Sequence, residues 1–467
     1  MISKHEFIRE YSKAIIDKQA SVFIGAGMSR SSGYVDWKEL LRPLASDIKL
    51  DVDKETDLVS LAQYYKNERS RGSINQTIMD AFTVNVELNE NLRILSRLPL
   101  STYWTTNYDN LIECALRESN RNPDVKHRQS QLSTATKDRD AIVYKMHGDI
   151  SDPSEAVLTK DDYEKYEQTR SLFRTALKGE LVSKTFLFTG FSFEDPNLEF
   201  ILGRVHSEMN NNTRPHYCFL KKINPSDVDF EYKKCKQELR IRDLSQRYGV
   251  QAVLLDSWDE ITELLNAVEK NVKLKRVFIS GSAQEFLTPW TKEKIEELAI
   301  ATAMKLVDKD YRITTGFGLG IGSAVINGAL TAIYKDKFRH TDEYLCLRPF
   351  PQNIIDPDER RRVFSAYRKD MISEVGAAIF ISGNKKSEEK IITAPGCMEE
   401  YKIAKDNGCI IIPIASTGYA AKDICEEIKV SIDDYEYLKN EMPILETSTD
   451  VNELANAIVR ILGKQNR

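Results

Sequence analysis

The sequence predicts an α/β protein built from two parallel-sheet domains. Its 467 residues exceed what one hydrophobic core usually organises. Apolar runs of strand length alternate with amphipathic helical stretches, which is the pattern of parallel sheets covered by helices. Two of these runs stop in a glycine turn, at Gly25 and at Gly281. We therefore expect two Rossmann-like domains, residues 1–272 and 273–467.

The composition argues against several classes of protein. Hydrophobic residues make up 41% and charged residues 29%, and the net charge of -5 gives no electrostatic reason to expect a nucleic-acid partner. No apolar run approaches the length of a membrane span, and residues 1–5 lack the apolar core of a signal peptide, so we expect a cytoplasmic protein. The 7 cysteines include no Cys-x-x-Cys pair and the 6 histidines no His-x-x-x-His pair, so no metal is expected.

The first predicted strand, residues 21–24, runs into a turn of small residues. Gly25 and Gly27 carry no Cβ, so the backbone can approach a ligand closely there. Ser29 adds a hydroxyl and a backbone N–H where a diphosphate would lie. Together with Ala26 between the glycines, these residues are candidates for binding a diphosphate.

Three further predicted strands also end in small or polar residues. In chain order they end in Asn107 and Asp109, in His147, and in Gly190 and Ser192. Open parallel sheets bind ligands at the carboxyl ends of their strands, so four such endings predict one shared site. The alternative is that Asn107 or Asp109 caps the next helix and that His147 is a structural group.

The other segments of the first domain complete the alternation. Helices are expected over residues 37–45, 56–70, 73–84, 110–117, 160–180 and 259–272. Residues 120–140 are polar and are predicted to form a loop. Strands over 217–220 and 250–255, with a charged helix between them, extend the sheet.

The second domain repeats the pattern with a strand over residues 277–282. The run 316–322 is the most glycine-dense stretch of the chain, and a helix begins near Ser323. Free N–H groups and a helix dipole at such a run attract phosphate, although no Gly-Lys-Ser/Thr makes it a Walker loop. The other expected elements are strands over 312–315, 344–348, 377–382 and 409–414, and helices over 290–307, 357–375, 397–407, 419–430 and 450–463.

Four short motifs of the first domain, in order, resemble sirtuins. They are Gly25-Ala26-Gly27-Met28-Ser29, Thr105-Thr106-Asn107-Tyr108-Asp109, His147-Gly148 and Gly190-Phe191-Ser192. The resemblance implies an NAD pocket with Asn107 and His147 as catalytic residues. It assigns the other candidates to NAD binding: Gly25, Ala26, Gly27 and Ser29 to the diphosphate, Asp109 to the nicotinamide side, and Gly190 and Ser192 to the adenosine side.

The departures from the sirtuin pattern bear on the substrate. Sirtuin deacylases carry a zinc ribbon after the His-Gly motif, whereas no cysteine lies between Cys114 and Cys218. Thr106 stands at the position of the usual glutamine and Phe191 at that of the usual threonine. The departures disfavour acyl-lysine recognition and leave the NAD pocket in place.

The second half resembles the SLOG class of nucleotide sensors and hydrolases. The matching segments are Gly281-Ser282, the run 316–322 and Pro395-Gly396-Cys397-Met398-Glu399-Glu400. Cys397 replaces the second motif glycine and Ile403 the final glutamate, which favours binding over hydrolysis. The candidate effector-binding residues are Gly281, Ser282, Gly318, Arg368, Lys386, Glu399 and Glu400.

Basic side chains near this motif suit a nucleotide. The predicted helix 357–375 carries Arg361, Arg362 and Arg368, and an arginine can bind a phosphate through two hydrogen bonds. Glu400 can accept hydrogen bonds from ribose hydroxyls. The alternative for any one of these residues is a solvated Arg/Glu pair on the surface.

A sirtuin-like domain followed by a SLOG-like sensor resembles the NAD-degrading effector family of the Thoeris anti-phage defence system. The resemblance implies an NAD+ glycohydrolase that uses NAD+ as substrate and releases nicotinamide and ADP-ribose. It also implies a cyclic ADP-ribose isomer as activator, made by a TIR-domain partner, and a homotetramer or higher assembly. The alternatives are a non-catalytic nucleotide-binding regulator and an NAD-dependent protein deacylase.

Overall fold

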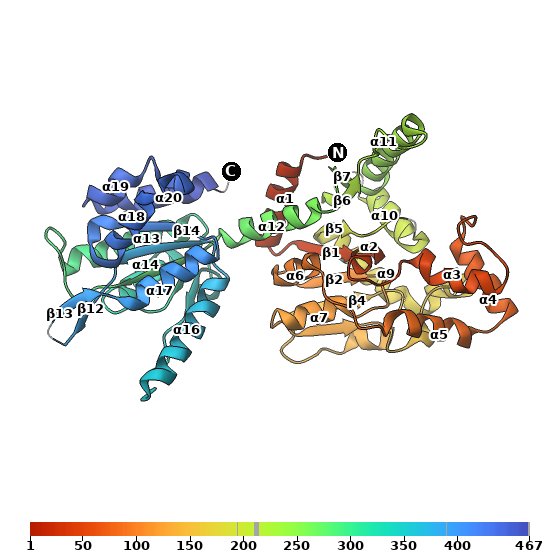
Figure 1. Ribbon diagram of the computed structural model, residues 1–467, viewed down its shortest axis with the longest axis horizontal. Helices are drawn as coiled ribbons and strands as arrows, with labels where there is room; N and C mark the ends of the chain where they lie inside the picture. Colours follow the sequence, from red (N-terminus) through yellow and green to blue (C-terminus); the bar gives the residue numbers. More distant parts are fainter. Residues whose placement is uncertain (194, 210–213, 389, 466–467) are drawn as a thin grey trace. The chain divides into compact units, whose positions relative to one another are not determined.

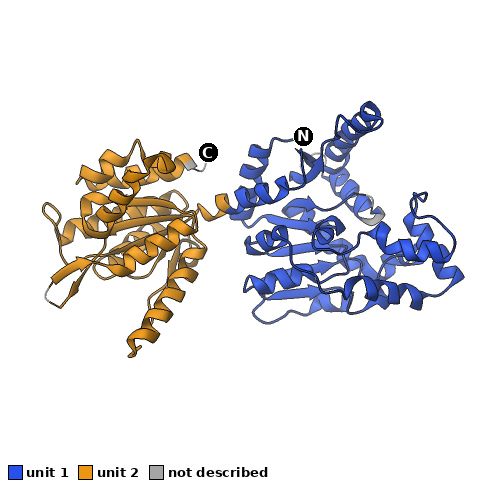
Figure 2. Cartoon of the chain, viewed as in Figure 1, with its two compact units in different colours: residues 1–269 blue, residues 270–467 orange. Residues whose placement is uncertain are grey.

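The computed structural model describes residues 1–193, 195–209, 214–388 and 390–465. The chain divides into two compact units, residues 1–269 and 270–467 (Figure 2). This division and the predicted boundary at residue 272 both lie in helix α12 (Glu260–Lys273). Each unit is built on its own parallel sheet, which confirms the predicted α/β class.

Unit 1 contains a 7-stranded parallel sheet in the order β3-β4-β2-β1-β5-β6-β7 (Figure 1). Its strands are β1 (Ala20–Ile24), β2 (Thr102–Thr105), β3 (Pro123–Lys126), β4 (Ala141–Lys145), β5 (Thr185–Thr189), β6 (His216–Lys221) and β7 (Val250–Leu255). The central strands β1 and β5 are buried along their whole length. Burial on both faces explains why their sequences are apolar runs without alternation.

Several helices of unit 1 begin at a capping side chain. Ser3, Asp36, Asp57, Ser70 and Asn89 each accept a hydrogen bond from the N–H three residues further on, which fixes where the helix starts. The helices before α12 are α1 (Lys4–Ile16), α2 (Ala26–Arg30), α3 (Trp37–Asp47), α4 (Leu58–Glu68), α5 (Arg71–Phe82), α6 (Glu90–Arg97), α7 (Leu111–Glu118), α8 (Lys160–Glu164), α9 (Tyr166–Ser183), α10 (Pro196–Glu208) and α11 (Phe230–Tyr248).

The strand pairing aligns one row of residues across the middle of this sheet. Thr105 of β2 pairs with Lys145 of β4 on one side and with Ile24 of β1 on the other. Ile24 also pairs with Thr189 of β5. All four strands leave the sheet directly beyond this row. The expectation that their polar endings meet at one sheet edge is therefore confirmed.

The prediction of a loop over residues 120–140 was wrong at β3. Asp124 and Lys126 are both buried there, and their side chains form an ion pair of 2.8 Å. Asp124 also accepts a hydrogen bond of 2.8 Å from Arg139. The charged side chains of this segment satisfy one another in the interior, so a polar composition coexists with a buried strand.

Unit 2 contains a 5-stranded parallel sheet in the order β10-β9-β8-β11-β14. Its strands are β8 (Arg276–Ser282), β9 (Arg312–Thr315), β10 (Leu345–Leu347), β11 (Ala377–Ser382) and β14 (Ile410–Ile414). A separate antiparallel hairpin, β12 (Asn384–Ser387) and β13 (Lys390–Thr393), follows β11 and was not predicted.

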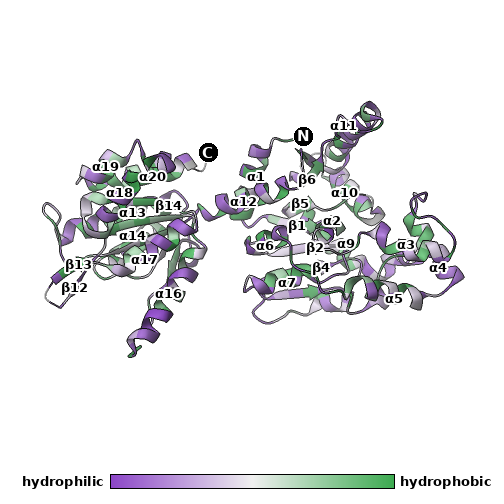
Figure 3. Cartoon of the chain, viewed as in Figure 1, coloured by the Kyte–Doolittle hydropathy of each residue, from purple (hydrophilic) through white to green (hydrophobic). Residues whose placement is uncertain are grey.

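The helices of unit 2 are α13 (Lys292–Asp308), α14 (Gly322–Ile333), α15 (Thr341–Tyr344), α16 (Pro357–Ser373), α17 (Pro395–Asp406), α18 (Tyr419–Val430), α19 (Met442–Thr447) and α20 (Val451–Gln465). Apolar residues concentrate in the strands and in the helix faces over them, whereas α11 and α16 are largely hydrophilic (Figure 3). In the part of the chain that the structure describes, no helix has the length and apolar character needed to cross a membrane.

Candidate functional sites

The glycine turn after β1 lies against the turn after β5. The N–H groups of Gly25 and Gly27 donate to the carbonyl oxygens of Thr189 and Gly190, each at 2.9 Å. A Cβ on Gly25 would lie 2.4 Å from the Gly190 oxygen, and Gly190 itself has a φ of +65°. These glycines are therefore required by the close approach of two backbones. Gly27 remains exposed, so a ligand can still reach this turn.

Ser29 joins the first two motifs in a buried chain of hydrogen bonds. The Asn107 amide donates to Ser29 Oγ at 2.9 Å, and Ser29 Oγ donates to Asp109 Oδ2 at 2.7 Å. Asp109 Oδ1 also accepts from the N–H of Leu111 at the start of α7, at 3.1 Å. Asp109 therefore binds the first N–H of α7 as well as Ser29, although the N-cap residue of this helix is Asn110. The orientation of the Asn107 amide is fixed by this chain.

A buried lysine binds the backbone of the turn that contains Asp109. Lys145 Nζ donates to the carbonyl oxygen of Tyr108 at 3.0 Å and also to that of Asp109. Its charge is balanced by the carboxylates of Glu113, at 3.3 Å, and Asp149. Burial alone would lower the pKa of Lys145, but Glu113, Asp149 and Asp109 together raise it, so the ammonium stays charged. It was not among the residues predicted from the sequence.

His147 is buried two residues beyond the end of β4, and Asn107 is buried two residues beyond the end of the neighbouring strand β2. Its carbonyl oxygen accepts from the N–H of Val157 at 2.8 Å. Its Nε2 lies 3.2 Å from Oδ2 of Asp195. Burial lowers the pKa of His147, an effect that Asp195 opposes, so the ring is neutral at neutral pH. A neutral imidazole can accept a proton from water or a hydroxyl.

The remaining candidates of unit 1 lie at the same edge. Ala26 is partly exposed at the start of α2, and the side chain of Ser192 is exposed after β5. The Ser192 carbonyl oxygen accepts from Arg240 of α11. Among the described residues, no group of three or more His, Cys, Asp or Glu side chains is placed to hold a metal ion.

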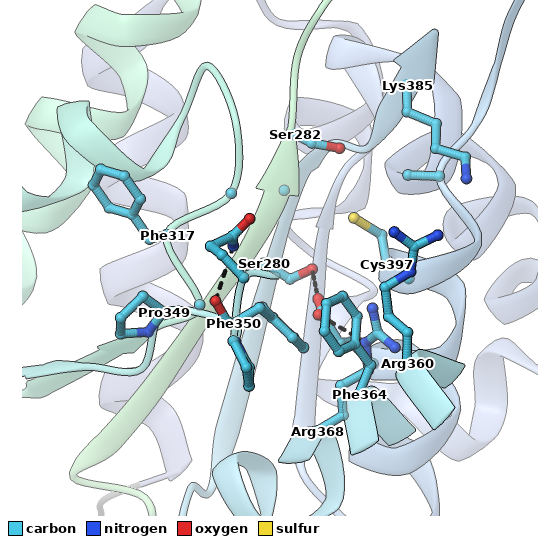
Figure 4. Close-up of a pocket in the computed structure, with 18 of the residues that line it drawn as sticks. Ser280, Ser282, Phe317, Pro349, Phe350, Arg360, Phe364, Arg368, Lys385 and Cys397 are labelled. Atoms are coloured by element: carbon cyan, nitrogen blue, oxygen red, sulfur yellow. Dashed lines mark hydrogen bonds and ion pairs between the residues drawn. The ribbon is translucent and has the colours of Figure 1, made fainter. Parts of the chain in front are cut away.

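Unit 2 contains a cavity of about 570 Å³ at the carboxyl edge of its sheet (Figure 4). The predicted residues Gly281, Ser282, Gly318, Arg368 and Glu400 line it. A Cβ on Gly318 would lie 1.9 Å from the Gly281 oxygen, so here too the glycine turns pack backbone against backbone. The cavity also has aromatic walls, formed by Phe278, Phe317, Phe350 and Phe364.

Arg368 and Glu400 bind each other at the base of this cavity. Arg368 donates to Glu400 at 3.3 Å and to Glu399 at 2.7 Å, and its guanidinium lies 4.9 Å from the ring centre of Phe350. Glu400 accepts from Ser280 Oγ at 2.6 Å. Burial raises the pKa of Glu400, although Ser280 and Arg368 oppose the rise. The surface-pair alternative is wrong for Glu400, which is 7% exposed.

One positively charged side chain of the cavity wall, Arg360, was not among those expected. Arg360 lines the cavity on the same face of α16 as Arg368, whereas the predicted neighbours Arg361 and Arg362 do not line it. Among the described residues, Lys385 rather than Lys386 lines the cavity, because successive residues of β12 point to opposite sides. Lys386 instead has its N–H bound to Gln284. Glu399 is not among the residues that line the cavity, but it forms an ion pair with Arg368, which does line it.

The sequence held a signal for part of this wall. Arg360, Phe364 and Arg368 are spaced by four residues, so they share one helix face. The positions of Lys145 and Asp195 had no such signal, because they depend on how distant turns meet.

Comparison with known proteins agrees with this arrangement. A profile of the Sir2- and TIR-associating SLOG family matches residues 260–465, and a profile of the SIR2-like domain matches residues 101–249. The NAD(+) hydrolase ThsA of Bacillus cereus (strain MSX-D12) is 48% identical over 435 residues, 92% of this chain and 90% of that protein. The chain belongs to the ThsA family of NAD(+) hydrolases.

Other ThsA proteins match over nearly the whole chain. The NAD(+) hydrolase ThsA of Cytobacillus dafuensis is 43% identical over 475 residues, 98% of this chain and 96% of that protein. That of Acinetobacter baumannii (strain 532279) is 43% identical over 463 residues, 97% and 95% of the two chains. The SIR2-like match contains Asn107 and His147, and the SLOG match contains the whole cavity wall. The family predicted from the motifs, and its enzyme class, are confirmed.

Proposed function

We propose that unit 1 hydrolyses NAD+ at the bond between nicotinamide and ribose, and that unit 2 switches this reaction on when a cyclic ADP-ribose isomer fills its cavity. The observation that carries the first part is the aligned row of Ile24, Thr105, Lys145 and Thr189. It brings the glycine turn, Asn107 and His147 to one sheet edge in a chain of the ThsA family.

The leaving group of this reaction needs little stabilisation by the protein. Nicotinamide departs as a neutral pyridine, so the protein has to stabilise an oxocarbenium-like ribose and deliver water. Water adds to the ribose carbon and the bond to the ring nitrogen breaks, giving ADP-ribose, nicotinamide and one proton. The Asn107 amide, fixed by Ser29, hydrogen-bonds the ribose or the water without adding charge. His147 accepts the proton.

The other residues of the edge hold the substrate in this proposal. Gly25, Ala26, Gly27 and Ser29 face the diphosphate, and Asp109 the nicotinamide side. Gly190 and the exposed Ser192 face the adenosine side. The support is their common place beyond the aligned row together with their order in the motifs.

The cavity of unit 2 suits a cyclic ADP-ribose isomer as effector. Its volume of about 570 Å³ lies in the usual range for ligands of that size. Phe317, Phe350 and Phe364 offer faces for adenine, and Arg360 and Lys385 offer positive charge for phosphates. Arg368 and Glu400 line the same cavity, Arg368 as a partner for phosphate and Glu400 as an acceptor for ribose hydroxyls.

The partner and the biological role that we propose also rest on the family. The matched SLOG family is described as Sir2- and TIR-associating, which supports a TIR-domain partner as the source of the isomer. Hydrolysis would then deplete NAD+ in the cytoplasm of a phage-infected cell. We propose a homotetramer or higher assembly as the active form.

The test is nicotinamide release from NAD+ by the purified full chain, alone and with each of several cyclic ADP-ribose isomers. The proposal predicts release that one isomer increases strongly and that His147→Ala abolishes. Binding of NAD+ without release under any condition would instead support a nucleotide-binding regulator. Release that no isomer changes would refute the switch and leave the hydrolase.

A further inference from the structure

Asp195 connects the turn after β5 to His147 after β4. The two strands are separated in the sheet by β2 and β1, so this contact crosses the site. Asp195 Oδ2 lies 3.2 Å from His147 Nε2. His147 is 6% exposed and Asp195 8%, so the pair is shielded from water.

The Asp195 carboxylate is held from two other sides. Its Oδ1 accepts a hydrogen bond of 2.9 Å from the N–H of Leu198, which makes Asp195 the N-cap of α10. Its Oδ2 accepts one of 3.0 Å from the hydroxyl of Tyr163 on α8. A carboxylate fixed in this way presents its remaining lone pairs to the imidazole in one geometry.

The imidazole ring is confined as well. Tyr163 and Tyr166 both pack edge-on against His147, with ring centres 5.7 and 6.1 Å away. Yet within the described part of the chain Nε2 makes no hydrogen bond of good geometry. A buried nitrogen beside a carboxylate with its bond not yet formed is common in catalytic pairs, whose hydrogen bonds tighten when substrate binds.

We infer that Asp195 is the positioning residue of the hydrolysis, acting through His147. In the substrate complex its carboxylate accepts the N–H of the facing imidazole nitrogen, which leaves the other nitrogen as the proton acceptor. It then balances the positive charge that the ring gains on taking the proton. The inference rests on the proposed role of His147 as proton acceptor.

Other charged groups around the ring do not replace this carboxylate. Arg170 of α9 is buried and donates to the carbonyl oxygens of His127 and Glu155, and its charge disfavours a protonated imidazole. Asp162 of α8 favours one, but it forms an ion pair of 2.6 Å with Arg71. Among these groups Asp195 is the carboxylate in direct contact with the ring.

The substitution Asp195→Asn separates positioning from helix capping. Asparagine caps helices as well as aspartate does, so the bond to Leu198 is retained while the negative charge is lost. With the full chain, NAD+ and the activating cyclic ADP-ribose isomer, we expect kcat to fall about 100-fold, with KM changed about threefold or less. The acid limb of the kcat/KM profile moves to lower pH, because the carboxylate that raises the pKa of His147 is gone.

Tyr163→Phe gives the opposite shift. It removes one hydrogen-bond donor from Asp195, so more of the negative charge acts on the imidazole, and the acid limb moves to higher pH. This variant also carries the test if Asp195→Asn does not fold. The matched control is Asp57→Asn, which changes the N-cap of α4 in the same way and leaves the profile in place.

A second readout does not depend on activity. The chain has 6 histidines, so the His147 imidazole signal can be assigned in NMR spectra of histidine-labelled protein by its loss in His147→Gln. Its titration midpoint falls in Asp195→Asn. An unchanged kcat, or a lower kcat with unchanged acid limb and imidazole titration, overturns the inference. If wild-type protein releases no nicotinamide, the proposed function fails, whereas the NMR titration still decides the Asp195–His147 contact.

Discussion

The candidate sites of the two units share one backbone arrangement but differ in the side chains around it. In each, glycine turns beyond parallel strands pack backbone on backbone, Gly25 against Gly190 and Gly281 against Gly318. In unit 1 the polar side chains at this edge bind one another, as Asn107 and Ser29 do. In unit 2 the edge opens into a cavity of about 570 Å³ with aromatic and positively charged walls.

The difference matches two kinds of task. A site that performs chemistry gains from side chains whose orientation is fixed before the substrate arrives, since no reorganisation is then needed in the transition state. A site that recognises a nucleotide needs volume, aromatic faces and positive charge. Unit 1 has the fixed side chains of a catalytic site, and unit 2 has the volume, aromatic faces and positive charge of a nucleotide-binding site. Substitutions in unit 1 should therefore change kcat, and substitutions in the cavity of unit 2 should change effector affinity.

The largest effect is expected from removing the buried cation of unit 1. In Lys145→Met the carboxylates of Glu113 and Asp149 lose their counter-charge, and the free energy of unfolding of unit 1 falls by about 3–5 kcal/mol. Calorimetry should show the transition of unit 1 at lower temperature and that of unit 2 unchanged. The control Lys178→Met removes an exposed partner of Glu208 and should cost less than about 1 kcal/mol. Equal losses in the two variants would contradict the account.

The second-largest effect is expected from breaking the hydrogen-bond chain that joins Asn107, Ser29 and Asp109. Ser29→Ala leaves the Oδ2 atom of Asp109 without its donor and the Asn107 amide without its acceptor, which costs about 1–3 kcal/mol and lowers kcat by up to about 100-fold. Nicotinamide release measures it. Ser31→Ala removes a neighbouring hydroxyl that donates to the Met28 carbonyl oxygen, and it should leave kcat nearly unchanged. A similar kcat for both variants would show that fixing Asn107 does not matter.

Acid should destabilise unit 1 before unit 2. Burial lowers the pKa of His216 to about 3, so below the ordinary value of 6.5 the unfolded chain binds a proton that the folded chain does not. Stability therefore falls as the pH falls, by about 2 kcal/mol at pH 5 from this residue alone. In unit 2 the histidine is His340, which is exposed.

Calorimetry at several pH values between 7.5 and 5 tests this difference. The transition of unit 1 should move to lower temperature more than that of unit 2. His216→Gln should reduce the shift, because glutamine does not titrate and can still accept from the N–H of Phe186. Equal shifts of both transitions would contradict the assignment.

The smallest effect is on effector affinity. Arg360→Ala removes one positive charge from the cavity wall and should weaken binding of the active cyclic ADP-ribose isomer about tenfold, near 1.4 kcal/mol. Arg361→Ala is the matched control, because that side chain is 82% exposed and pairs with Asp358. Calorimetric titration of both variants measures the difference. A loss in Arg361→Ala equal to that in Arg360→Ala would mean that only overall charge matters.

Much of the fold followed from the sequence because the signals were local. Buried strands such as β1 are continuous apolar runs, and the glycine turns follow directly. The strand β3 was missed because Asp124 and Lys126 are buried only as an ion pair, and the composition does not reveal pairing. The hairpin after β11 was missed because its strands are mostly polar and lie outside the main sheet.

The site residues, like the strands, could be predicted only where their signal was local in the sequence. Asn107 and His147 could be grouped because both follow predicted strands, and parallel strands end at one edge. Asp195 reaches His147 only through the turn after β5, and Lys145 depends on where Tyr108 and Asp109 place their carbonyl oxygens. The choice between Lys385 and Lys386 depended on the hairpin, which was not predicted.

The central claim is that chemistry and effector binding belong to separate sites, one in each unit. The most direct test titrates the activating cyclic ADP-ribose isomer into wild-type protein and into Asn107→Ala, with binding followed by calorimetry and nicotinamide release measured in the same samples. We predict the same dissociation constant for both proteins, with release in the wild type and none in Asn107→Ala. Loss of isomer binding in Asn107→Ala, or full release by that variant, would contradict the claim.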